Sequence, residues 1–257
     1  MREALGVYRE PRFSPGKVGD DRAILDLTAE RLRGIGIAVR LVAGEDLRPP
    51  PRSPALVFAM CQGEEALAVL ESFCCPVVNP APAIRNCFRV SLVRHFDEAG
   101  VPQPRWRIAG DELPRDLGAA PWLKRGDVHA MQAADVRRVR DEQEWTRALA
   151  DLRRRGAPAA IAQEHREGAV YKFYGVGNGF FRAFGLRPDR EPEAAALAAA
   201  GARALGLSVY GGDGVCAPDG SLVLIDFNDW PSFSRCREDA SVAIAGHLHE
   251  QIETAGL

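Results

Sequence analysis

GLSVYGGDGVCAPDGSLVLIDFNDWPSF, residues 206–233, is the stretch that decides the fold. Two apolar, β-rich runs flank a turn at 217–220 that contains Pro-Asp-Gly, and this pattern predicts an antiparallel hairpin. Asp213 lies in the first run, whereas Asp226 and Asn228 lie one residue apart at the end of the second and share a face. Such oxygen ligands suit Mg²⁺ bound to phosphate, and charges inside apolar strands are costly unless they are used. We interpret the three residues as a magnesium site, with turn-capping residues of a surface hairpin as the alternative.

The composition describes an ordinary water-exposed globular chain. Of the 257 residues, 26% are charged and 46% hydrophobic, and the formal net charge is −2. The sequence has no long run of like charge, so we expect no nucleic-acid partner. It also has no apolar run near the ~20 residues that a membrane span needs, so we expect no membrane span. The six cysteines form no CxxC pair and lie mostly in apolar runs, as reduced buried thiols do. Because the first residues, MREALG, also do not resemble a signal peptide, we expect a cytoplasmic protein.

Residues 1–82 alternate between strand-like and helix-like patterns, which predicts a small parallel α/β lobe. The expected strands are 5–8, 37–42, 55–60 and 76–79, and the expected helices are 20–33 and 64–71. The loop 12–17, which ends in Lys17, runs into a helix N-terminus and could receive an anion there. A simple turn rich in Pro and Gly is the alternative.

Two further regions follow, 83–156 and 157–257, so the fold class is α/β (α+β). We expect one amphipathic helix over 84–99, strands at 106–108, 121–124 and 136–140, and a helix over 141–155. The last region should hold a strand over 157–164, a hairpin over 169–185, helices over 191–205 and 238–254, and the opening hairpin between them. Lys124 ends an apolar run and is one of three lysines, so it is either a functional cation or a strand-end lysine that reaches solvent.

The order of these segments resembles the ATP-grasp superfamily over nearly the whole chain. The segments that carry the resemblance are VVNPAPAI (77–84), AGVPQPRWRI (99–108), PWLK (121–124), AIAQEH (160–165) and the hairpin of the opening stretch. The start of the chain is similar to that of glutathione-synthetase-like members. The resemblance implies a lobe that precedes the ATP-grasp domains (1–82), a central lid domain (83–156) and a C-terminal ATP-grasp domain (157–257). It also implies ATP between two antiparallel sheets, with ATP and Mg²⁺ as the cofactors.

The resemblance assigns roles to individual residues. The edge of the adenine would lie against Gln163, Glu164 and His165. The carboxylate of Glu167 would accept a hydrogen bond from the ribose, and the phosphates would face Lys124 and Arg89. The metal ligands would be Asp213, Asp226 and Asn228, and Arg182 would stabilise an anionic intermediate or bind an acidic substrate. Three features depart from the family. Arg89 stands where members usually carry a lysine, Asp226 stands where they usually carry Glu, and the lid over 125–131 has a single glycine.

Two reactions fit this resemblance. In ATP-grasp ligases a carboxylate takes the γ-phosphate, and an amine or thiol captures the resulting acylphosphate; we favour this reaction. Segments around His129, Lys172 and IDFNDWPSF are similar to inositol tetrakisphosphate kinases, which implies that His129 and Lys172 bind substrate phosphates. Lys17, Ser232, Ser234 and Arg235 are further candidates for contacts with an anionic small-molecule substrate. A non-catalytic nucleotide-binding module is the third alternative, and a homodimer is left open.

Overall fold

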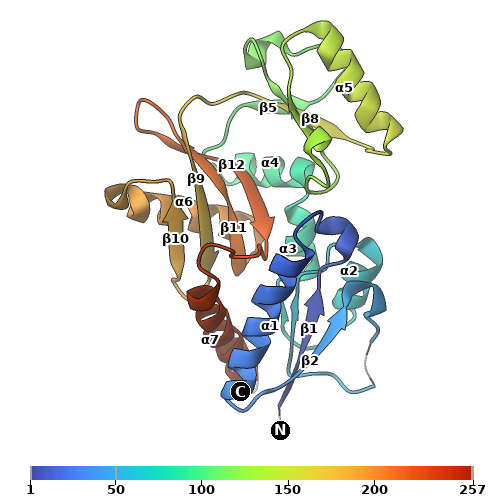
Figure 1. Ribbon diagram of the computed structural model, residues 1–257, viewed down its shortest axis with the longest axis vertical. Coiled ribbons are helices and arrows are strands. Elements are labelled where there is room, and N and C mark those ends of the chain that lie inside the picture. The colour runs from blue at the N-terminus through green and yellow to red at the C-terminus, as the bar shows by residue number, and fades with distance from the viewer. Residues whose placement is uncertain (1, 50, 256–257) are drawn as a thin grey trace.

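Three four-stranded sheets follow one another along the long axis of the molecule (Figure 1). The computed structural model describes residues 2–49 and 51–255. Within that part of the chain, no helix is both long and apolar enough to cross a membrane. Short 3-10 helices occur in the connections: η1 (Pro11–Phe13), η2 (Gly44–Asp46), η3 (Arg115–Leu117), η4 (Ala133–Asp135) and η5 (Pro188–Arg190).

The first sheet is parallel, as the alternation of segments predicts. Its strands are β1 (Glu3–Tyr8), β2 (Ala38–Ala43), β3 (Leu56–Ala59) and β4 (Val77–Val78), in the order β2-β1-β3-β4. Alternate residues of β1 and β3 enter two separate cores, because successive side chains of a strand point to opposite faces. Helix α1 (Val18–Gly34) covers one face and α2 (Glu64–Glu71) covers the other.

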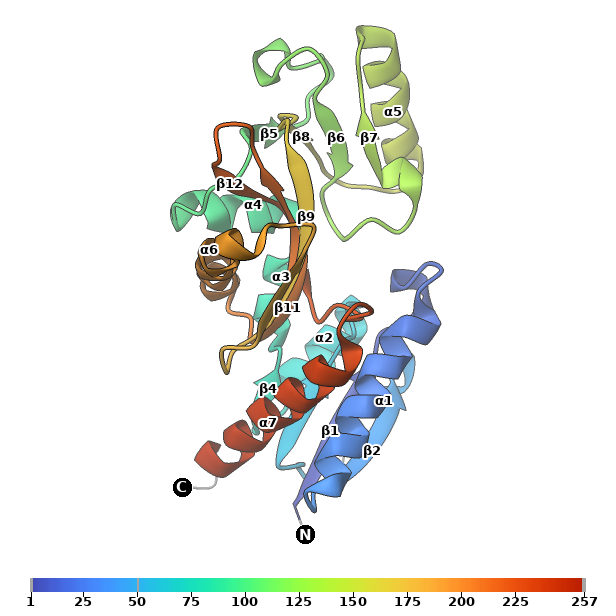
Figure 2. The same ribbon diagram turned by 60° about the vertical axis from the view of Figure 1, so that its left-hand side comes forward.

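The last helix of the chain completes this first lobe. Helix α7 (Arg237–Ala255) runs beside α1 in both ribbon views (Figures 1 and 2). Ile244 and Leu248 of α7 share one buried cluster with Ile24 and Leu25 of α1. The same cluster includes residues of the third sheet, so it joins the two ends of the chain and two of the lobes.

The single helix expected over 84–99 is wrong, because the structure has two. Helix α3 (Ala81–Asn86) ends before Phe88, and α4 (Arg89–Glu98) begins after it. Phe88 is extended, with ψ at 130°, and its side chain packs on the core of the first lobe. The sequence did not predict the break, because the apolar residues keep helical spacing through Phe88. As a result, Arg89 is the first residue of a new helix.

The second sheet is antiparallel, in the order β5-β8-β6-β7. Its strands are β5 (Trp106–Ile108), β6 (Trp122–Arg125), β7 (Val136–Arg138) and β8 (Ala160–Gln163). Helix α5 (Glu142–Arg154) covers this sheet through Trp145 and Leu149. Strand β8, which the sequence places at the start of the last region, is thus hydrogen-bonded between two strands of the middle sheet.

The third sheet contains the predicted hairpin. Its antiparallel strands β9 (Ala169–Val176), β10 (Phe181–Phe184), β11 (Val209–Cys216) and β12 (Leu222–Asp229) have the order β10-β9-β11-β12. Helix α6 (Glu191–Leu205) packs closely on one face, because a Cβ on Gly201 would lie only 2.9 Å from the ring of Phe227. The other face is left for the second sheet and the loops between them.

Asn79 connects the first and third sheets from a fully buried position. Its side-chain amide donates to the carbonyl of Val209 at 2.7 Å. Its side-chain oxygen accepts from the backbone N–H groups of Ser208 and Val209 at 2.9 and 3.1 Å. These bonds fix the start of β11 and therefore the position of the hairpin.

Candidate functional site

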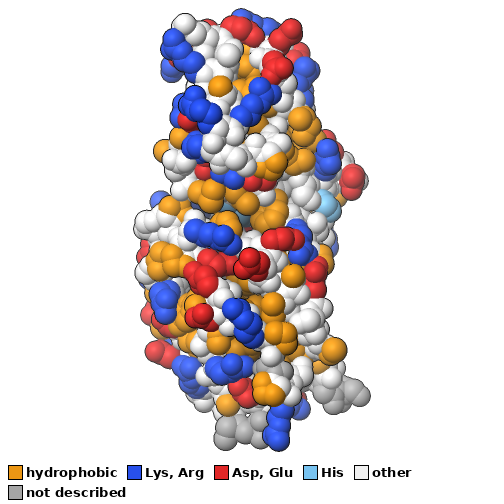
Figure 3. Space-filling view, turned by 90° about the vertical axis from the view of Figure 1, so that its right-hand side faces the viewer, with side chains coloured by type: hydrophobic (Ala, Val, Ile, Leu, Met, Phe, Trp, Pro, Cys, Tyr) orange, Lys and Arg blue, Asp and Glu red, His pale blue; other side chains and the backbone are white. Residues whose placement is uncertain are grey.

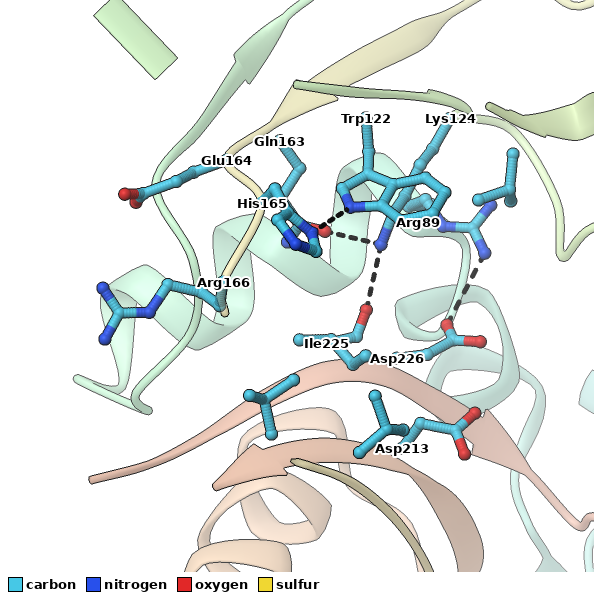
Figure 4. A pocket seen from close by; sticks show the side chains of 13 residues that line it. Arg89, Trp122, Lys124, Gln163, Glu164, His165, Arg166, Asp213, Ile225 and Asp226 are labelled. Atoms are coloured by element: carbon cyan, nitrogen blue, oxygen red, sulfur yellow. Dashed lines mark hydrogen bonds and ion pairs between the residues drawn. The ribbon is translucent and has the colours of Figure 1, made fainter. Parts of the chain in front are cut away.

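A cavity of about 380 Å³ lies between the second and third sheets. Figure 4 shows it with β12 below and the ends of β6 and β8 above. The residues that line it include Arg89, Trp122, Lys124, Gln163, Glu164, His165, Arg166, Asp213, Ile225 and Asp226. Five of the predicted nucleotide residues and two of the predicted metal ligands therefore lie around one hollow, which we call the first cavity.

Lys124 extends from β6 across the first cavity to the hairpin. Its ammonium donates to Oε1 of Gln163 at 2.5 Å and to the carbonyl of Ile225 at 3.1 Å. Burial, and to a smaller extent repulsion by Arg89, lowers the pKa of Lys124 to about 8. An anion in the cavity would stabilise the charged form. The side chain of Lys124 is therefore buried at the cavity and does not reach solvent at the strand end, while its role stays a prediction.

Arg89 takes its position from the helix break. As the first residue of α4 it is buried, and its guanidinium donates to the carbonyl of Arg125 at 3.0 Å and lies 3.5 Å from Oδ1 of Asp226. The next residue, Val90, donates its backbone N–H to Gly126 at 2.9 Å. The start of α4 is therefore attached to the loop that follows β6, and the planar guanidinium of Arg89 faces the cavity (Figure 4).

The two acids of the hairpin are direct cross-strand partners. Asp213 of β11 is paired in register with Asp226 of β12, and Asn228 lies opposite Gly211, one pair further along the same face. Burial raises the pKa of Asp226, but the positive charges of Arg89, His129, Lys124 and Lys172 outweigh burial, so the pKa lies below the usual value. Asp226 is therefore ionised at neutral pH.

The upper rim of the first cavity is built around Trp122 and His165. The indole N–H of Trp122 donates to Nδ1 of His165 at 3.1 Å. Since indole is only a donor, Nδ1 must be unprotonated, and the ring proton lies on Nε2, 3.0 Å from Glu167. Trp122 and Arg166 were not among the predicted site residues, although Trp122 lies within the quoted PWLK segment.

Glu164 and Glu167 differ in their placement. Glu164 lines the first cavity, but its carboxylate pairs with Arg105 at 3.1 Å, and Figure 4 shows it pointing away from Lys124. The side chain of Glu167 is 76% exposed and pairs with His165 and Arg138. Glu167 lies outside the first cavity, on its outer edge, so the structure does not place it with the other predicted nucleotide residues.

A second cavity, of about 470 Å³, lies between the third sheet and the first lobe. All of the predicted substrate-side residues except Arg182 line it, together with one predicted metal ligand: Lys17, His129, Lys172, Ser232, Ser234, Arg235 and Asn228. The ammonium of Lys172 lies 2.8 Å from Oδ1 of Asp213, which lines the first cavity. The two cavities therefore adjoin along the row of polar residues in the hairpin.

Arg9 borders the second cavity and was missed by the sequence analysis. Its guanidinium donates to the backbone carbonyls of Met60, Asp229 and Trp230 at 2.9–3.1 Å and to Asp21 at 3.2 Å. These bonds join the first sheet to the end of β12. A lone arginine at a strand end gives no sequence signal for this role, because its partners are backbone atoms about 50 and 220 residues away.

The turn after β12 delivers the serines to the second cavity. Trp230 and Phe233 have φ angles of 36° and 49°, which are strained for such residues, and both side chains are completely buried. Burial of the two rings holds the backbone in this form. The polar residues between and after them, Ser232, Ser234 and Arg235, are thereby directed to the cavity.

Arg182 does not take the predicted position. It lies on β10, at the edge of the third sheet and outside both cavities, where it stacks on Phe180 and lies 3.6 Å from Asp239 of α7. Its strand register places it on the same face as Asn228, but Gly211 and Tyr174 intervene. The structure therefore gives no support for contact between Arg182 and a reacting group.

The donor set of the hairpin fits magnesium. Among the described residues, no group of three or more His, Cys, Asp or Glu side chains is arranged to hold a metal ion. The hairpin instead offers two carboxylates, one with a lowered pKa, and one amide oxygen on the same face. Hard oxygen ligands that leave positions free for water and phosphate are what Mg²⁺ requires.

Charges of both signs cover one outer face of the molecule. On the face in Figure 3, Lys and Arg side chains alternate with Asp and Glu along the whole length. The concentration of basic groups is thus a property of the cavities rather than of this outer face.

Comparisons with known proteins give structural matches only. No protein-family model matches the sequence, and no curated protein matches it. A RimK-domain ATP-grasp protein from Sphaerobacter thermophilus superposes with a TM-score of 0.72 at 23% identity, over 96% of this chain and 99% of that one. The D-cycloserine synthetase DcsG gives a TM-score of 0.72 at 18% identity over 97% and 99% of the two chains. D-alanyl-alanine synthetase A from Vibrio cholerae gives 0.74 at 9% identity over 99% and 98%.

Proposed function

The chain has the ATP-grasp fold, and on that premise we propose that it is a Mg²⁺- and ATP-dependent ligase. The reaction would join a carboxylate to an amine or thiol through an acylphosphate. Solved structures with this fold include D-cycloserine synthetase and D-alanyl-alanine synthetase, and this supports ligation over other uses of ATP.

One observation carries the proposal. Two cavities adjoin at Asp213, Asp226 and Asn228, with Lys124 and Arg89 around the first and Lys172 and His129 at the second. A nucleotide in the first cavity with its phosphates toward the hairpin would present its last phosphate to the second. Transfer of that phosphate needs positioning and neutralisation of charge, and the residues at the junction supply both.

The first cavity would hold ATP. Lys124 and Arg89 would bind the phosphates, and Gln163, Glu164 and His165 lie where the β8 segment could edge the base. Asp213, Asp226 and Asn228 would hold magnesium, which would neutralise phosphate charge. The lowered pKa of Lys124 keeps this cation responsive to an incoming anion.

The second cavity would hold an anionic small-molecule substrate. Lys17 and Arg235 border it, and Ser232 and Ser234 add hydroxyl donors. Arg235 stacks over the ring of Phe184, and its guanidinium makes no hydrogen bond or ion pair with the residues that the structure describes. Its donors are therefore available to a carboxylate or phosphate group.

A kinase for a phosphorylated polyol is the second candidate. Four basic side chains border the second cavity besides Arg9, namely Lys17, His129, Lys172 and Arg235, and such a set suits several phosphate groups at once. A ligase needs fewer. The charge of the second cavity is thus the observation that favours the kinase.

One assay distinguishes these reactions. The protein is incubated with Mg²⁺ and ATP against two panels: amino acids and peptides with hydroxylamine present, and phosphorylated polyols. ADP release together with hydroxamate indicates an acylphosphate and therefore ligation. ADP release only with a phosphorylated polyol overturns the ligase, whereas nucleotide binding without turnover on a broad panel favours a non-catalytic module. Lys124→Met, tested in parallel, should lose whichever activity is found.

A further inference from the structure

A histidine from the loop after β6 meets a buried carboxylate at the wall of the second cavity. In Figure 2 the loop between β6 and β7 extends from the middle sheet toward the third sheet. His129, in this loop, has Nε2 3.4 Å from Oδ1 of Asp229, the last residue of β12. The His129 side chain is 15% exposed, whereas that of Asp229 is fully buried. Asp229 played no part in the sequence analysis.

Asp229 has unused capacity to accept hydrogen bonds. Its Oδ1 accepts from the amide of Gln62 at 2.8 Å. Its Oδ2 is buried without a hydrogen-bond partner among the described residues, and the nearest cation, Arg9, lies 3.9 Å away. Buried carboxylate oxygens are nearly always bonded, so an under-satisfied one beside a cavity indicates a functional role.

The orientation of His129 leaves one ring nitrogen available. Nε2 is buried 3.4 Å from Oδ1 of Asp229 without a hydrogen-bond partner of its own among the described residues, and Nδ1 makes no hydrogen bond there either. A proton on Nε2 would be stabilised by the carboxylate, and Nδ1 would then carry a free lone pair on a side chain that lines the second cavity. This is the arrangement of a base held in one tautomer by an acid behind it.

We propose that His129 is the proton acceptor for the attacking amine and that Asp229 positions it. The proposal rests on the ligase reaction proposed above. The amine nitrogen forms a bond to the acyl carbon of the acylphosphate, and the bond between that carbon and the phosphate oxygen breaks, which releases inorganic phosphate. The N–H bond of the amine breaks as well, and its proton moves to Nδ1 of His129. Asp229 stabilises the imidazolium that results.

The proposal differs from a phosphate-binding role for the same histidine. A phosphate ligand would act while the γ-phosphate is transferred, so its loss would slow acylphosphate formation. A base would act only after that step. Hydroxylamine separates the two roles, because it is unprotonated at neutral pH and attacks activated acyl groups without help from a base.

The test measures how the acylphosphate is divided between two acceptors. A carboxylate that gives hydroxamate in the assay above is incubated with Mg²⁺, ATP, hydroxylamine and the twenty common amino acids as amines. We expect His129→Gln to lower the ratio of amide to hydroxamate by about 10²-fold or more, the usual contribution of a general base. Imidazole in the buffer should restore amide formation in His129→Ala, and Asp229→Asn should lower the ratio by less than His129→Gln does.

His249→Gln is the matched control, because His249 lies on the exposed side of α7 beside Glu253. It should keep the wild-type ratio. An unchanged ratio in His129→Gln, with both products lowered equally or neither lowered, overturns the base and leaves the ligase standing. A wild-type protein that forms no hydroxamate with any carboxylate overturns the ligase and the base together.

Discussion

Lys172 and Asp213 form an ion pair, 2.8 Å between Nζ and Oδ1, that connects the two cavities. Lys172 lines the second cavity and Asp213 lines the first. The two residues are also direct cross-strand partners on β9 and β11, so the sheet register fixes their separation. The ion pair therefore lies at the boundary of the two cavities, and a change of charge in one cavity changes the electrostatic potential in the other.

Replacement of Lys172 by Met should weaken the use of the anionic substrate more than the binding of the nucleotide. The ammonium is the donor of the second cavity that lies next to the acids, and a hydrogen bond to a charged group contributes about 1.5–3 kcal/mol. We expect kcat/KM for the anionic substrate to fall about 10- to 100-fold. Nucleotide affinity, measured by calorimetry, should change much less. An equal loss in both would show that Lys172 acts mainly through Asp213.

Asp226→Ala should abolish turnover and leave the fold intact. The substitution removes a candidate magnesium ligand, and we expect ADP release to fall by more than about 10²-fold. It also leaves Arg89 without its carboxylate partner, which should cost about 1–3 kcal/mol of stability. Asp219→Ala is the control, because Asp219 lies in the exposed turn of the same hairpin. Normal turnover in Asp226→Ala would show that the metal assignment is wrong.

Nucleotide binding should depend on pH through Lys124. Burial lowers the pKa of Lys124 to about 8, so its charge is lost in the free protein as the pH rises through that value. Bound phosphates favour the charged form, and binding at pH 9 must therefore take up a proton. Affinity for a non-hydrolysable ATP analogue should fall by up to about tenfold between pH 8 and pH 9.

Calorimetry in two buffers of different ionisation enthalpy would count that proton. Lys124→Met should bind more weakly at pH 7 and should lose the proton uptake. The same lowered pKa means that the unfolded state binds more protons than the native state between about pH 8 and the usual lysine pKa, so this residue makes the native state relatively more stable as the pH rises there. Proton uptake that persists in Lys124→Met would assign it to another group.

Asn79→Ala should destabilise the protein through the hairpin. It removes three hydrogen bonds and leaves buried backbone groups of Ser208 and Val209 unpaired. We expect the free energy of unfolding to fall by about 2–4 kcal/mol. Asn86→Ala, which removes one bond to the carbonyl of Leu205 at a half-buried position, should cost about 1 kcal/mol. Chemical denaturation would measure both, and equal losses would argue against a special role for Asn79.

The hairpin could be predicted because its signals are local. Alternation, a Pro-Asp-Gly turn and acids inside apolar strands all lie within 28 residues, and the observed register pairs Asp213 with Asp226. The three-sheet architecture and the ATP-grasp fold are also confirmed. The grouping of Lys17, His129 and Arg235 around one cavity agrees with the residues proposed from the sequence, although their roles stay predictions.

What could not be predicted depends on distant contacts. The break at Phe88 follows from packing against another lobe, which helix periodicity does not report. Asp229 was not predicted, because it lies on the opposite face of the strand from the predicted ligand Asn228. Its contacts with Gln62 and His129 come from parts of the chain that are distant in sequence. The prediction for Arg182 depended only on the order of segments in the family. Strand β10 lies at the edge of the third sheet, so Arg182 lies outside both cavities and beside Asp239.

The return of α7 to the first lobe has a consequence for synthesis. One side of α1 is covered by Ile244 and Leu248, which the ribosome adds more than 200 residues after Ile24. Until α7 is synthesised, the first lobe therefore exposes an apolar face of α1, which chaperones can bind and which can associate with other chains. Synthesis of α7, rather than emergence of the first sheet, is the step that lets this core close.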